Sequence, residues 1–321
     1  LFENLKAIGI QIMIKGKLEN IYANKEVIVS SGSINSPKLL QLSGIGDEHE
    51  LRQLGIEVTH HLPGVGKNLQ DHLEIYVQHE SKTSDTLYSL FNNPFLKVFS
   101  GIQWFLSKKG LLAHSHLELG GFVKSDARFD HPNIQLHFFP ALVINHGLTN
   151  PDRHAFQFHA SPNRPTSRGW VKLRSSNPEE DPAIQFNYLE TEEDRLQMRD
   201  CVKIARNIFS QKSFQHYAGK ELRPGKNVQD NDVLDEIIRD TSDTAYHPSC
   251  TNKMGKDKFS VVDDETKVHG VSNLRVIDSS IMPDIVSGNI NAATLMIAEK
   301  ASDIILGKEE EPIDVDIFAA A

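Results

Sequence analysis

The residues best suited to catalysis gather between positions 246 and 291. His247 stands in the polar cluster Tyr246-His247-Pro248-Ser249-Cys250, and Asn289 and Asn291 come at the start of a long apolar segment. A histidine whose pKa lies near neutrality can take a proton from an alcohol, and an asparagine amide can donate a hydrogen bond to an oxyanion. We therefore predict an active-site segment here, with His247 as the candidate base.

Each of these residues also has an ordinary structural explanation. Hydrogen bonds at the end of a strand can hold His247, and asparagine is a good helix cap. Asp278 follows the strand-like run 274–277. It either hydrogen-bonds the ribose or ribityl hydroxyls of a cofactor or serves as a turn residue. The residues alone leave these alternatives open.

Other familiar site patterns are absent or weak. The sequence has no G-x-G-x-x-G and no G-x-S-x-G motif. His114, His116 and Glu118 alternate along an extended segment and could share one face of it. A pair of surface histidines explains this spacing more simply, so we predict no metal site. Glu118 is either an exposed strand carboxylate or the counter-ion of a cationic ligand.

Composition narrows the class of partner. The chain has 321 residues, which is room for about two domains. Its formal net charge is −9 and no basic stripe appears, which argues against nucleic acid as a partner. Cys201 and Cys250 are far apart in the sequence, so we expect no disulfide framework. No apolar run is long enough to predict a membrane-spanning helix.

The elements that must position the candidate residues start with a strand over residues 25–30, which ends at Ser31-Gly32-Ser33. A buried strand followed by a glycine turn is typical of doubly wound α/β domains. The segment 35–42 comes next and predicts a helix, with Ser36 as its cap and Pro37 at its first position. Further predictions in this part are a strand at 6–12, a turn at 15–17, a helix at 47–54 stopped by Gly55, and a strand at 56–60.

The character of the sequence changes near residue 73, where a second domain with a mainly antiparallel sheet is predicted. The chain later contains one clear amphipathic helix, 192–212, with a stripe that includes Leu196, Val202 and Phe209. The predicted strands are 73–79, 117–125, 133–140, 155–160, 169–174 and 183–186, and the other predicted elements are a helix at 230–240, a buried helix at 291–306 capped by Gly307, and a tail at 309–321.

Four segments carry a resemblance to a known family. Residues 32–46, GSINSPKLLQLSGIG, resemble the second signature of the glucose–methanol–choline (GMC) flavin oxidoreductases. Residues 62–72 are similar to the segment that follows it in that family, and residues 247–255 and 273–300 resemble the C-terminal block. The resemblance extends to about Gly307. It implies part of a doubly wound FAD-binding domain at 1–72, a substrate-binding domain at 73–245, and a return to the FAD-binding domain at 246–308.

The resemblance also implies a chemistry. Members of the family oxidise alcohols by hydride transfer to FAD. By motif position, His247 is the expected active-site base and Asn289 the second catalytic residue, which helps to hold the alkoxide. The positions expected near the flavin are Gly32, Ser33, Asp278, Gly288 and Ala292.

Within the family, residues 116–122, 186–189 and 247–255 look most like the choline dehydrogenase branch. This implies oxidation of choline to betaine aldehyde, the route to glycine betaine, with Glu118 as the candidate carboxylate for the quaternary ammonium. It also implies electron transfer to a membrane acceptor, at the mitochondrial inner membrane of a eukaryote or the cytoplasmic membrane of a bacterium. A GMC enzyme for another alcohol or sugar remains an alternative.

One departure from the family pattern is large. The N-terminal glycine fingerprint and the first family signature are missing from this sequence. We therefore expect a C-terminal fragment of a longer protein. The corresponding alternative function is a non-catalytic truncated product that keeps the substrate-binding domain and binds no flavin.

Overall fold

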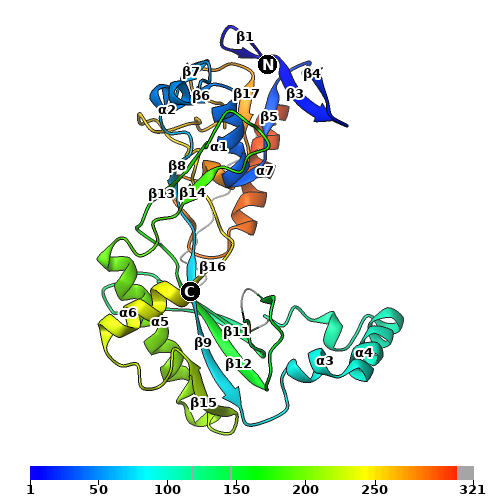
Figure 1. The fold of residues 1–321 in the computed structure, drawn as a ribbon, viewed down its shortest axis with the longest axis vertical. Helices are drawn as coiled ribbons and strands as arrows, with labels where there is room; N and C mark the ends of the chain where they lie inside the picture. The colour runs from blue at the N-terminus through cyan, green and yellow to red at the C-terminus, as the bar shows by residue number, and fades with distance from the viewer. Residues whose placement is uncertain (118, 145–146, 309–321) are drawn as a thin grey trace.

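The computed structural model describes residues 1–117, 119–144 and 147–308, which form two lobes (Figure 1). The first lobe combines the N-terminal and C-terminal parts of the chain, and the second is built mainly from the middle. Glu118 and the predicted tail, 309–321, lie outside the described residues. The predicted α/β fold with a largely antiparallel second sheet is confirmed.

The centre of the first lobe is a parallel pair of short strands from opposite ends of the chain. β5 (Val27–Val29) pairs with β17 (Leu274–Val276), and the side chains of Val29 and Val276 are buried between the surrounding elements. α1 (Gly32–Leu42) follows β5 directly, and the 3-10 helix η4 (Ser279–Ile281) follows β17 and contacts α1. The ends of both strands therefore meet at one place.

The remaining elements of this lobe surround that pair. They are β1 (Phe2–Glu3), β2 (Lys6–Ala7), β3 (Gly9–Ile14), β4 (Lys17–Tyr22), β6 (Ile45–Gly46), α2 (Glu48–Gln53), β7 (His60–His61), β8 (Lys67–Leu69), β13 (Gly169–Lys172), β14 (Ala183–Gln185) and α7 (Asn291–Leu306).

α1 begins earlier than predicted, so the predicted roles of Ser36 and Pro37 are wrong. Ser31 occupies the cap position, and Pro37 lies inside the helix. A proline lacks the N–H that would bond the carbonyl four residues back, which here belongs to Ser33. That carbonyl accepts from the Thr251 hydroxyl at 2.7 Å instead. A contact from the C-terminal part thus makes an internal proline tolerable.

Two further predictions for this lobe are corrected. Most of the strand predicted at 6–12 lies in β3, which pairs with β4 in an antiparallel hairpin. The sequence analysis did not predict β4. The strand predicted at 56–60 is reduced to β7, which pairs with the short β6. The helix predicted at 47–54 is confirmed as α2, with the Asp47 carboxylate accepting from two backbone N–H groups of its first turn.

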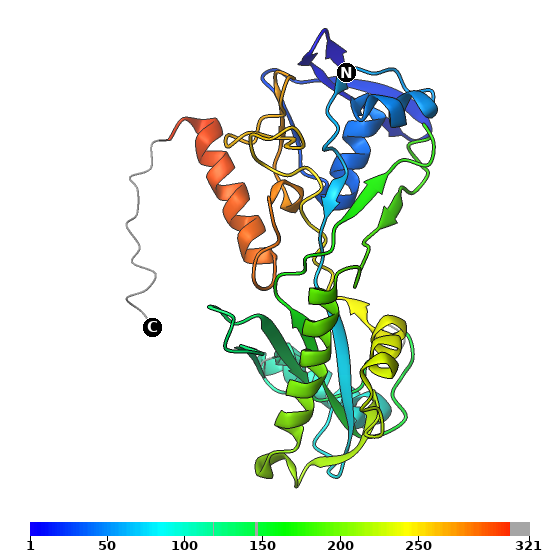
Figure 2. The ribbon, with the colours of Figure 1, turned by 90° about the vertical axis from the view of Figure 1, so that its left-hand side faces the viewer.

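The second lobe is an antiparallel sheet of order β10-β11-β12-β9-β15, with β16 pairing to the other end of β9. One face is apolar and packs against α5 (Glu192–Phe209), which crosses the sheet in Figure 2. The other elements of the lobe are β9 (Leu73–Ser81), α3 (Tyr88–Asn92), α4 (Pro94–Ser107), η1 (Leu111–Ala113), β10 (Leu119–Val123), β11 (Ile134–Phe139), β12 (Ala155–Pro162), η3 (Lys212–Phe214), β15 (Ala218–Arg223), α6 (Asn231–Thr241) and β16 (Asp243–Thr244).

Not every strand predicted after residue 73 joins this sheet. β13 and β14 form a separate three-stranded sheet with β8, so the prediction of a shared sheet is wrong for them. In α5, Met198 and Cys201 are buried, whereas Leu196 of the predicted stripe is exposed. α7 has the predicted bounds and the predicted Gly307 cap, but its predicted burial is wrong, because Ala301 is its one buried residue among those described.

Candidate active site

The candidate base lies where several segments cross between the lobes. The buried carboxylate of Asp71, between β8 and β9, accepts from the backbone N–H of His247 at 2.8 Å. It also accepts from the hydroxyls of Tyr188 and Thr244. Burial is the largest influence on the pKa of Asp71 and raises it, although these three donors act in the opposite direction. Asp71 thus holds three crossing segments together and sets the position of His247.

His247 and Asn289 are brought together as predicted. The Nε2 atom of His247 lies 3.2 Å from the amide nitrogen of Asn289. The other ring nitrogen, Nδ1, lies 3.0 Å from Nδ1 of His72, a buried residue that the sequence reading did not single out. His247 is half-buried and Asn289 is exposed, so a small molecule can reach both side chains.

The hydrogen bonds assign the ring protons of both histidines. Nε2 of His72 lies 2.9 Å from the carbonyl oxygen of Asn163, which can only accept, so this nitrogen carries a proton. In neutral His72 the other nitrogen, Nδ1, is then an acceptor. Nδ1 of His247 must donate to it. The lone pair of His247 is therefore on Nε2, the atom that faces Asn289.

Burial keeps this arrangement neutral. It lowers the pKa of His72 to about 4, mainly because the protonated ring would lose its hydration. Burial also lowers the pKa of His247, while the negative charge of Glu74 acts in the opposite direction. Near neutral pH, His247 is consequently an unprotonated base whose available nitrogen is Nε2.

Asn289 is oriented by the second lobe. Its side-chain oxygen accepts from the Gln135 amide at 2.9 Å, so its NH₂ group points at His247. The same Gln135 nitrogen lies 2.8 Å from Nε2 of His137. Gly288, just before Asn289, has φ +155°, a conformation that L side chains rarely adopt. This residue sets the chain direction that aims Asn289 at the base.

A polar face of the second sheet adjoins the pair. In β9, β11 and β12, alternate residues point away from the apolar core and include Glu74, Tyr76, His137 and His159. Nδ1 of His159 lies 2.9 Å from the Glu74 carboxylate, and the Tyr76 and His159 rings are 4.4 Å apart between centroids.

These sheet residues are absent from the sequence-based candidates. The signal available for them is alternation: polar residues occupy every second position of strands whose other positions are strongly apolar. In an isolated strand this pattern indicates a solvent-facing side, so it does not by itself mark a site. The burial of Glu74 and Tyr76 here is a consequence of tertiary structure.

Gly32, Ser33 and Asp278, which are expected near a flavin, lie in one hydrogen-bonded cluster at the ends of β5 and β17. The Asp278 carboxylate accepts from the Gly32 N–H at 2.9 Å, from the Ser280 N–H at 2.8 Å and from the Ser36 hydroxyl. The Ser33 hydroxyl lies 2.8 Å from that of Ser279. Both carboxylate oxygens of Asp278 thus have protein donors, and these hydrogen bonds join α1 to the end of β17.

The start of α7 follows directly after Asn289. Its cap position is Ile290, and no side chain caps the helix, so neither Asn289 nor Asn291 has the capping role considered above. The first-turn N–H groups, including that of the exposed Ala292, lack a side-chain acceptor there. An uncapped helix N-terminus favours a negatively charged or electron-rich group.

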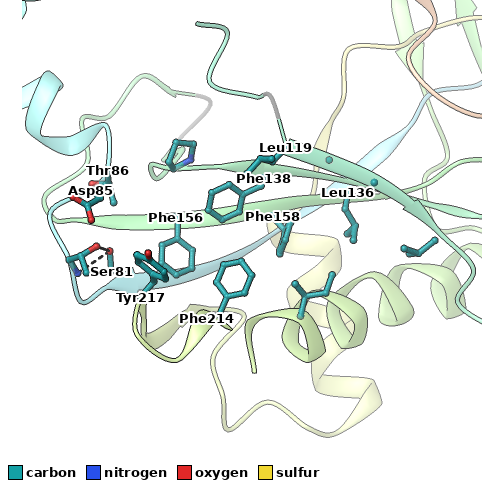
Figure 3. Close-up of a pocket in the computed structure, with 16 residues that line it drawn as sticks. Ser81, Asp85, Thr86, Leu119, Leu136, Phe138, Phe156, Phe158, Phe214 and Tyr217 are labelled. Carbon is teal, nitrogen blue, oxygen red and sulfur yellow. Dashed lines mark hydrogen bonds between the residues drawn. The ribbon is translucent and has the colours of Figure 1, made fainter. Parts of the chain in front are cut away.

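A strongly apolar cavity is separate from this site (Figure 3). It has a volume of about 490 Å³ and lies between the sheet and the segment after α5. Phe138 and Phe158 line it, and they alternate with His137 and His159, so the cavity is on the opposite face of the sheet. His247 and Asn289 are not among the residues that line it.

Neither a metal site nor a disulfide is found among the described residues. Within residues 1–117, 119–144 and 147–308, no cluster of His, Cys, Asp and Glu has the arrangement to hold a metal ion. Cys201 and Cys250 are both buried and unpaired with each other. In the same part of the chain, no helix combines the length and apolar character needed to cross a membrane.

Comparison with known proteins gives consistent matches. Two family models, both described as GMC oxidoreductase, match residues 1–74 and 165–298. The chain is 52% identical over 310 residues to the mitochondrial choline dehydrogenase of Homo sapiens, covering 96% of this chain and 52% of that protein. It is 48% identical over 322 residues to the oxygen-dependent choline dehydrogenase of Staphylococcus xylosus, covering 99% of this chain and 57% of that protein.

The fold matches as well. An Aspergillus oryzae RIB40 formate oxidase structure, from a study of FAD modification, superimposes with a TM-score of 0.90 at 25% identity, covering 95% of this chain and 58% of that one. The chain spans about half the length of the curated relatives it matches. The catalytic geometry, the two family models and the extent of these likenesses agree, and the chain belongs to the GMC oxidoreductase family.

Proposed function

We propose that this protein oxidises choline to betaine aldehyde by hydride transfer to FAD. The observation that carries the proposal is the hydrogen-bond chain Asn163–His72–His247–Asn289, which leaves an unprotonated Nε2 of His247 beside an amide donor. This is the pair of groups needed to deprotonate an alcohol and hold the resulting oxygen anion. The choline dehydrogenase relatives support the choice of substrate.

The residues present fit a flavin. The uncapped start of α7 presents backbone N–H groups directly after Asn289. A Cβ atom at Gly288 would lie 3.6 Å from the Phe122 ring, in ordinary contact. Gly32, Ser33, Asp278, Gly288 and Ala292 are the proposed flavin-facing positions. When bound, FAD supplies the acceptor for the hydride that leaves the alcohol carbon.

The side chains perform the proton chemistry. Nε2 of His247 takes the hydroxyl proton of the alcohol, while His72 accepts the hydrogen bond from Nδ1 of the resulting imidazolium. The Asn289 NH₂ group donates to the alkoxide oxygen and is held in that orientation by Gln135. The helix dipole of α7 favours negative charge in the same region. Each group is positioned before the reaction, which is the basis of electrostatic catalysis.

The substrate cation needs a different kind of contact. A quaternary ammonium group donates no hydrogen bond, so aromatic faces and carboxylates are its expected partners. Glu118 remains our proposed carboxylate, although it lies outside the described residues. The sheet face near His247 adds Glu74 and the Tyr76 ring, and the charge of Glu74 already acts on the pKa of His247.

The relatives also support a proposal for the cellular location of the protein and for its electron acceptor. Curated relatives include mitochondrial and bacterial choline dehydrogenases. We propose that electrons pass to a membrane acceptor, at the mitochondrial inner membrane if the source is eukaryotic and the cytoplasmic membrane if it is bacterial.

The decisive experiment mixes the full-length, FAD-loaded protein with choline without oxygen and follows the absorbance of the oxidised flavin. We expect rapid bleaching, and His247→Ala should slow it by about 100-fold or more, because a positioned base contributes about 10²–10⁴. Asn289→Ala is expected to slow it as well.

Matched substrates separate the alternatives. A flavin that stays oxidised with choline but bleaches with another alcohol or a sugar would keep the family chemistry and reject the substrate. A full-length protein that binds no flavin would instead identify a non-catalytic product. Glu118→Gln should raise KM for choline far more than for an uncharged alcohol, and equal changes would remove Glu118 from the cation site.

A further inference from the structure

α4 turns its apolar side away from the rest of the described chain. Its large apolar residues Phe95, Val98, Phe99, Ile102, Phe105 and Leu106 recur at steps of three and four, which places them on one face of the helix. All six are exposed, with Phe95 at 85%, Leu106 at 77% and Phe105 at 72%. A helix of a globular protein normally turns such a face inward.

The inward side of α4 is the less apolar one. Ser100 is its one buried residue, and Leu96 packs against the small cluster of Leu87, Leu90 and Ala141. The main neighbours of α4 are α3 and η1. In Figure 1, α3 and α4 lie at the outer end of the second lobe, away from α7. Packing among the described residues of this chain therefore does not account for the apolar face.

The charge around this helix differs from that of the chain as a whole. No Asp or Glu occurs between Asp85 and Glu118, although the sequence has 43 acidic residues and a net charge of −9. The same stretch contains Lys97, Lys108 and Lys109. Lys108 ends the helix, and its ammonium lies 4.0 Å from the centre of the Trp104 ring. The result is an apolar face bordered by lysines and an interfacial aromatic residue.

These features together describe a surface complementary to lipid. Apolar and aromatic side chains enter the acyl boundary of a bilayer, while lysines reach its headgroups. With 14 residues, α4 is about 21 Å long at 1.5 Å per residue. This is shorter than the hydrocarbon core of about 30 Å. The geometry suits a helix that lies along one membrane leaflet.

A second copy of this face is a poorer partner. A symmetric contact would bring the lysines of both copies to one interface, and the stretch contains no carboxylate to pair with them. Anionic lipid headgroups supply the missing negative charge. We propose that α4, with Phe95, Phe105 and Leu106 at its apolar face, docks the protein on the surface of a membrane containing anionic lipids. This inference does not depend on which alcohol the enzyme oxidises.

The test is flotation of the full-length, FAD-loaded protein with lipid vesicles. One set consists of phosphatidylcholine and the other contains about one-third phosphatidylglycerol in addition. We expect binding to both, stronger to the anionic set and weakened by salt. Phe95→Ser combined with Phe105→Ser and Leu106→Ser should lower the bound fraction by about tenfold or more in both sets.

Charge and exposure are separated by matched variants. Lys108→Glu combined with Lys109→Glu should reduce binding to the anionic vesicles and leave binding to phosphatidylcholine nearly unchanged. Leu148→Ser, at an 81% exposed leucine outside α4, and Leu18→Ser, at a 62% exposed leucine in β4, control for general loss of apolar surface. Unchanged flavin reduction by substrate in each variant reports an intact fold.

Three results would overturn the proposal. The first is an unaltered protein that does not float with either vesicle set even at low salt. The second is a loss of binding in the control variants as large as that in the α4 variant, which would show that exposed apolar residues act wherever they lie. The third is a serine variant that changes from dimer to monomer in light scattering while its vesicle binding is unaltered, which would assign the face to a second copy.

Discussion

At the scale of single residues, the central feature is how one carbonyl oxygen determines the chemistry of a distant ring. The Asn163 carbonyl places a proton on Nε2 of His72, which makes Nδ1 of His72 an acceptor and Nδ1 of His247 a donor. Histidine is useful as a base only when the correct nitrogen bears the lone pair. Burial, which lowers the pKa of His72 to about 4, keeps this relay neutral under ordinary conditions.

The role of His72 is testable with two substitutions. His72→Leu removes the acceptor of the Nδ1 proton and should slow anaerobic flavin reduction per bound flavin by about tenfold to a hundredfold, because His247 then samples the wrong tautomer. His72→Gln keeps one acceptor and one donor and should recover much of the rate. Stopped-flow absorbance measures both.

The pH dependence provides a second readout of the same relay. Because burial lowers the pKa of His247, its neutral form prevails down to below the ordinary value near 6.5. The reduction rate should therefore fall on the acid side only below about pH 6.5. If His72→Leu lowers the melting temperature but leaves the rate per flavin unchanged, His72 supports the fold and not the base.

At the scale of elements, the junction of β17 and α1 depends on one buried carboxylate. Asp278 ends β17 and accepts from the first residue of α1, from Ser36 in its second turn and from η4. The sequence motif 32–46 is thus completed by a residue about 240 positions away. The proline inside α1 depends on the same neighbourhood, through the Thr251 hydroxyl.

Asp278→Asn should measure what this junction contributes. One amide oxygen cannot replace two carboxylate oxygens, so an N–H of Gly32 or Ser280 is left facing an NH₂ group. We expect a loss of about 2–4 kcal/mol in the free energy of unfolding, since a buried unpaired donor costs about 1–3 kcal/mol and charged acceptors are stronger. Urea unfolding provides the value.

Ser36→Ala is the matched control for that experiment. It removes a single donor to Asp278 and should cost about 1 kcal/mol. Equal losses in the two variants would mean that the backbone N–H bonds to Asp278 contribute little, contrary to the expectation.

At the scale of the whole molecule, the lobes meet at Asp71. His247, the proposed base, comes from the connection after β16, and Asn289 comes from the loop before α7. Gln135, which orients Asn289, lies in β11, and His72, which contacts His247, directly precedes β9. Asp71 joins the crossing segments through Tyr188, Thr244 and the backbone of His247. Placement of the base is therefore coupled to the placement of the lobes.

Asp71→Ala should lower both stability and the flavin reduction rate, with a loss of about 2–4 kcal/mol in the free energy of unfolding. Asp71→Asn should be milder. Burial raises the pKa of the Asp71 carboxyl, so its contribution to stability is full below the ordinary value and decreases as pH rises through the folded-state pKa. The neutral amide avoids that loss near neutral pH.

Denaturation in urea at two pH values compares the variants. An Asp71→Asn protein that is less stable than Asp71→Ala at neutral pH would contradict this account.

Local signals were sufficient for the parts of the site that lie within continuous motifs. His247 and Asn289 stand in recognisable segments, and their meeting is confirmed by the 3.2 Å contact. The bounds of α7 and the strands β9 to β12 follow from periodicity and turn residues, because these depend on neighbours in sequence. The proposed flavin-facing and substrate-binding roles remain predictions.

The sequence by itself determined the family and the α/β class and singled out His247 and Asn289 as the proposed catalytic residues, because each of these predictions depends on a continuous motif. Only the tertiary structure decided the partners of that pair: His72 is 175 residues from His247, and Gln135 is 154 from Asn289. The tertiary structure also decided which apolar faces are covered by other segments. α7, which was expected to be buried, is largely exposed, and the apolar face of α4 is exposed as well. Side-chain periodicity defines a face, but what that face meets depends on contacts between distant segments, which no local pattern encodes.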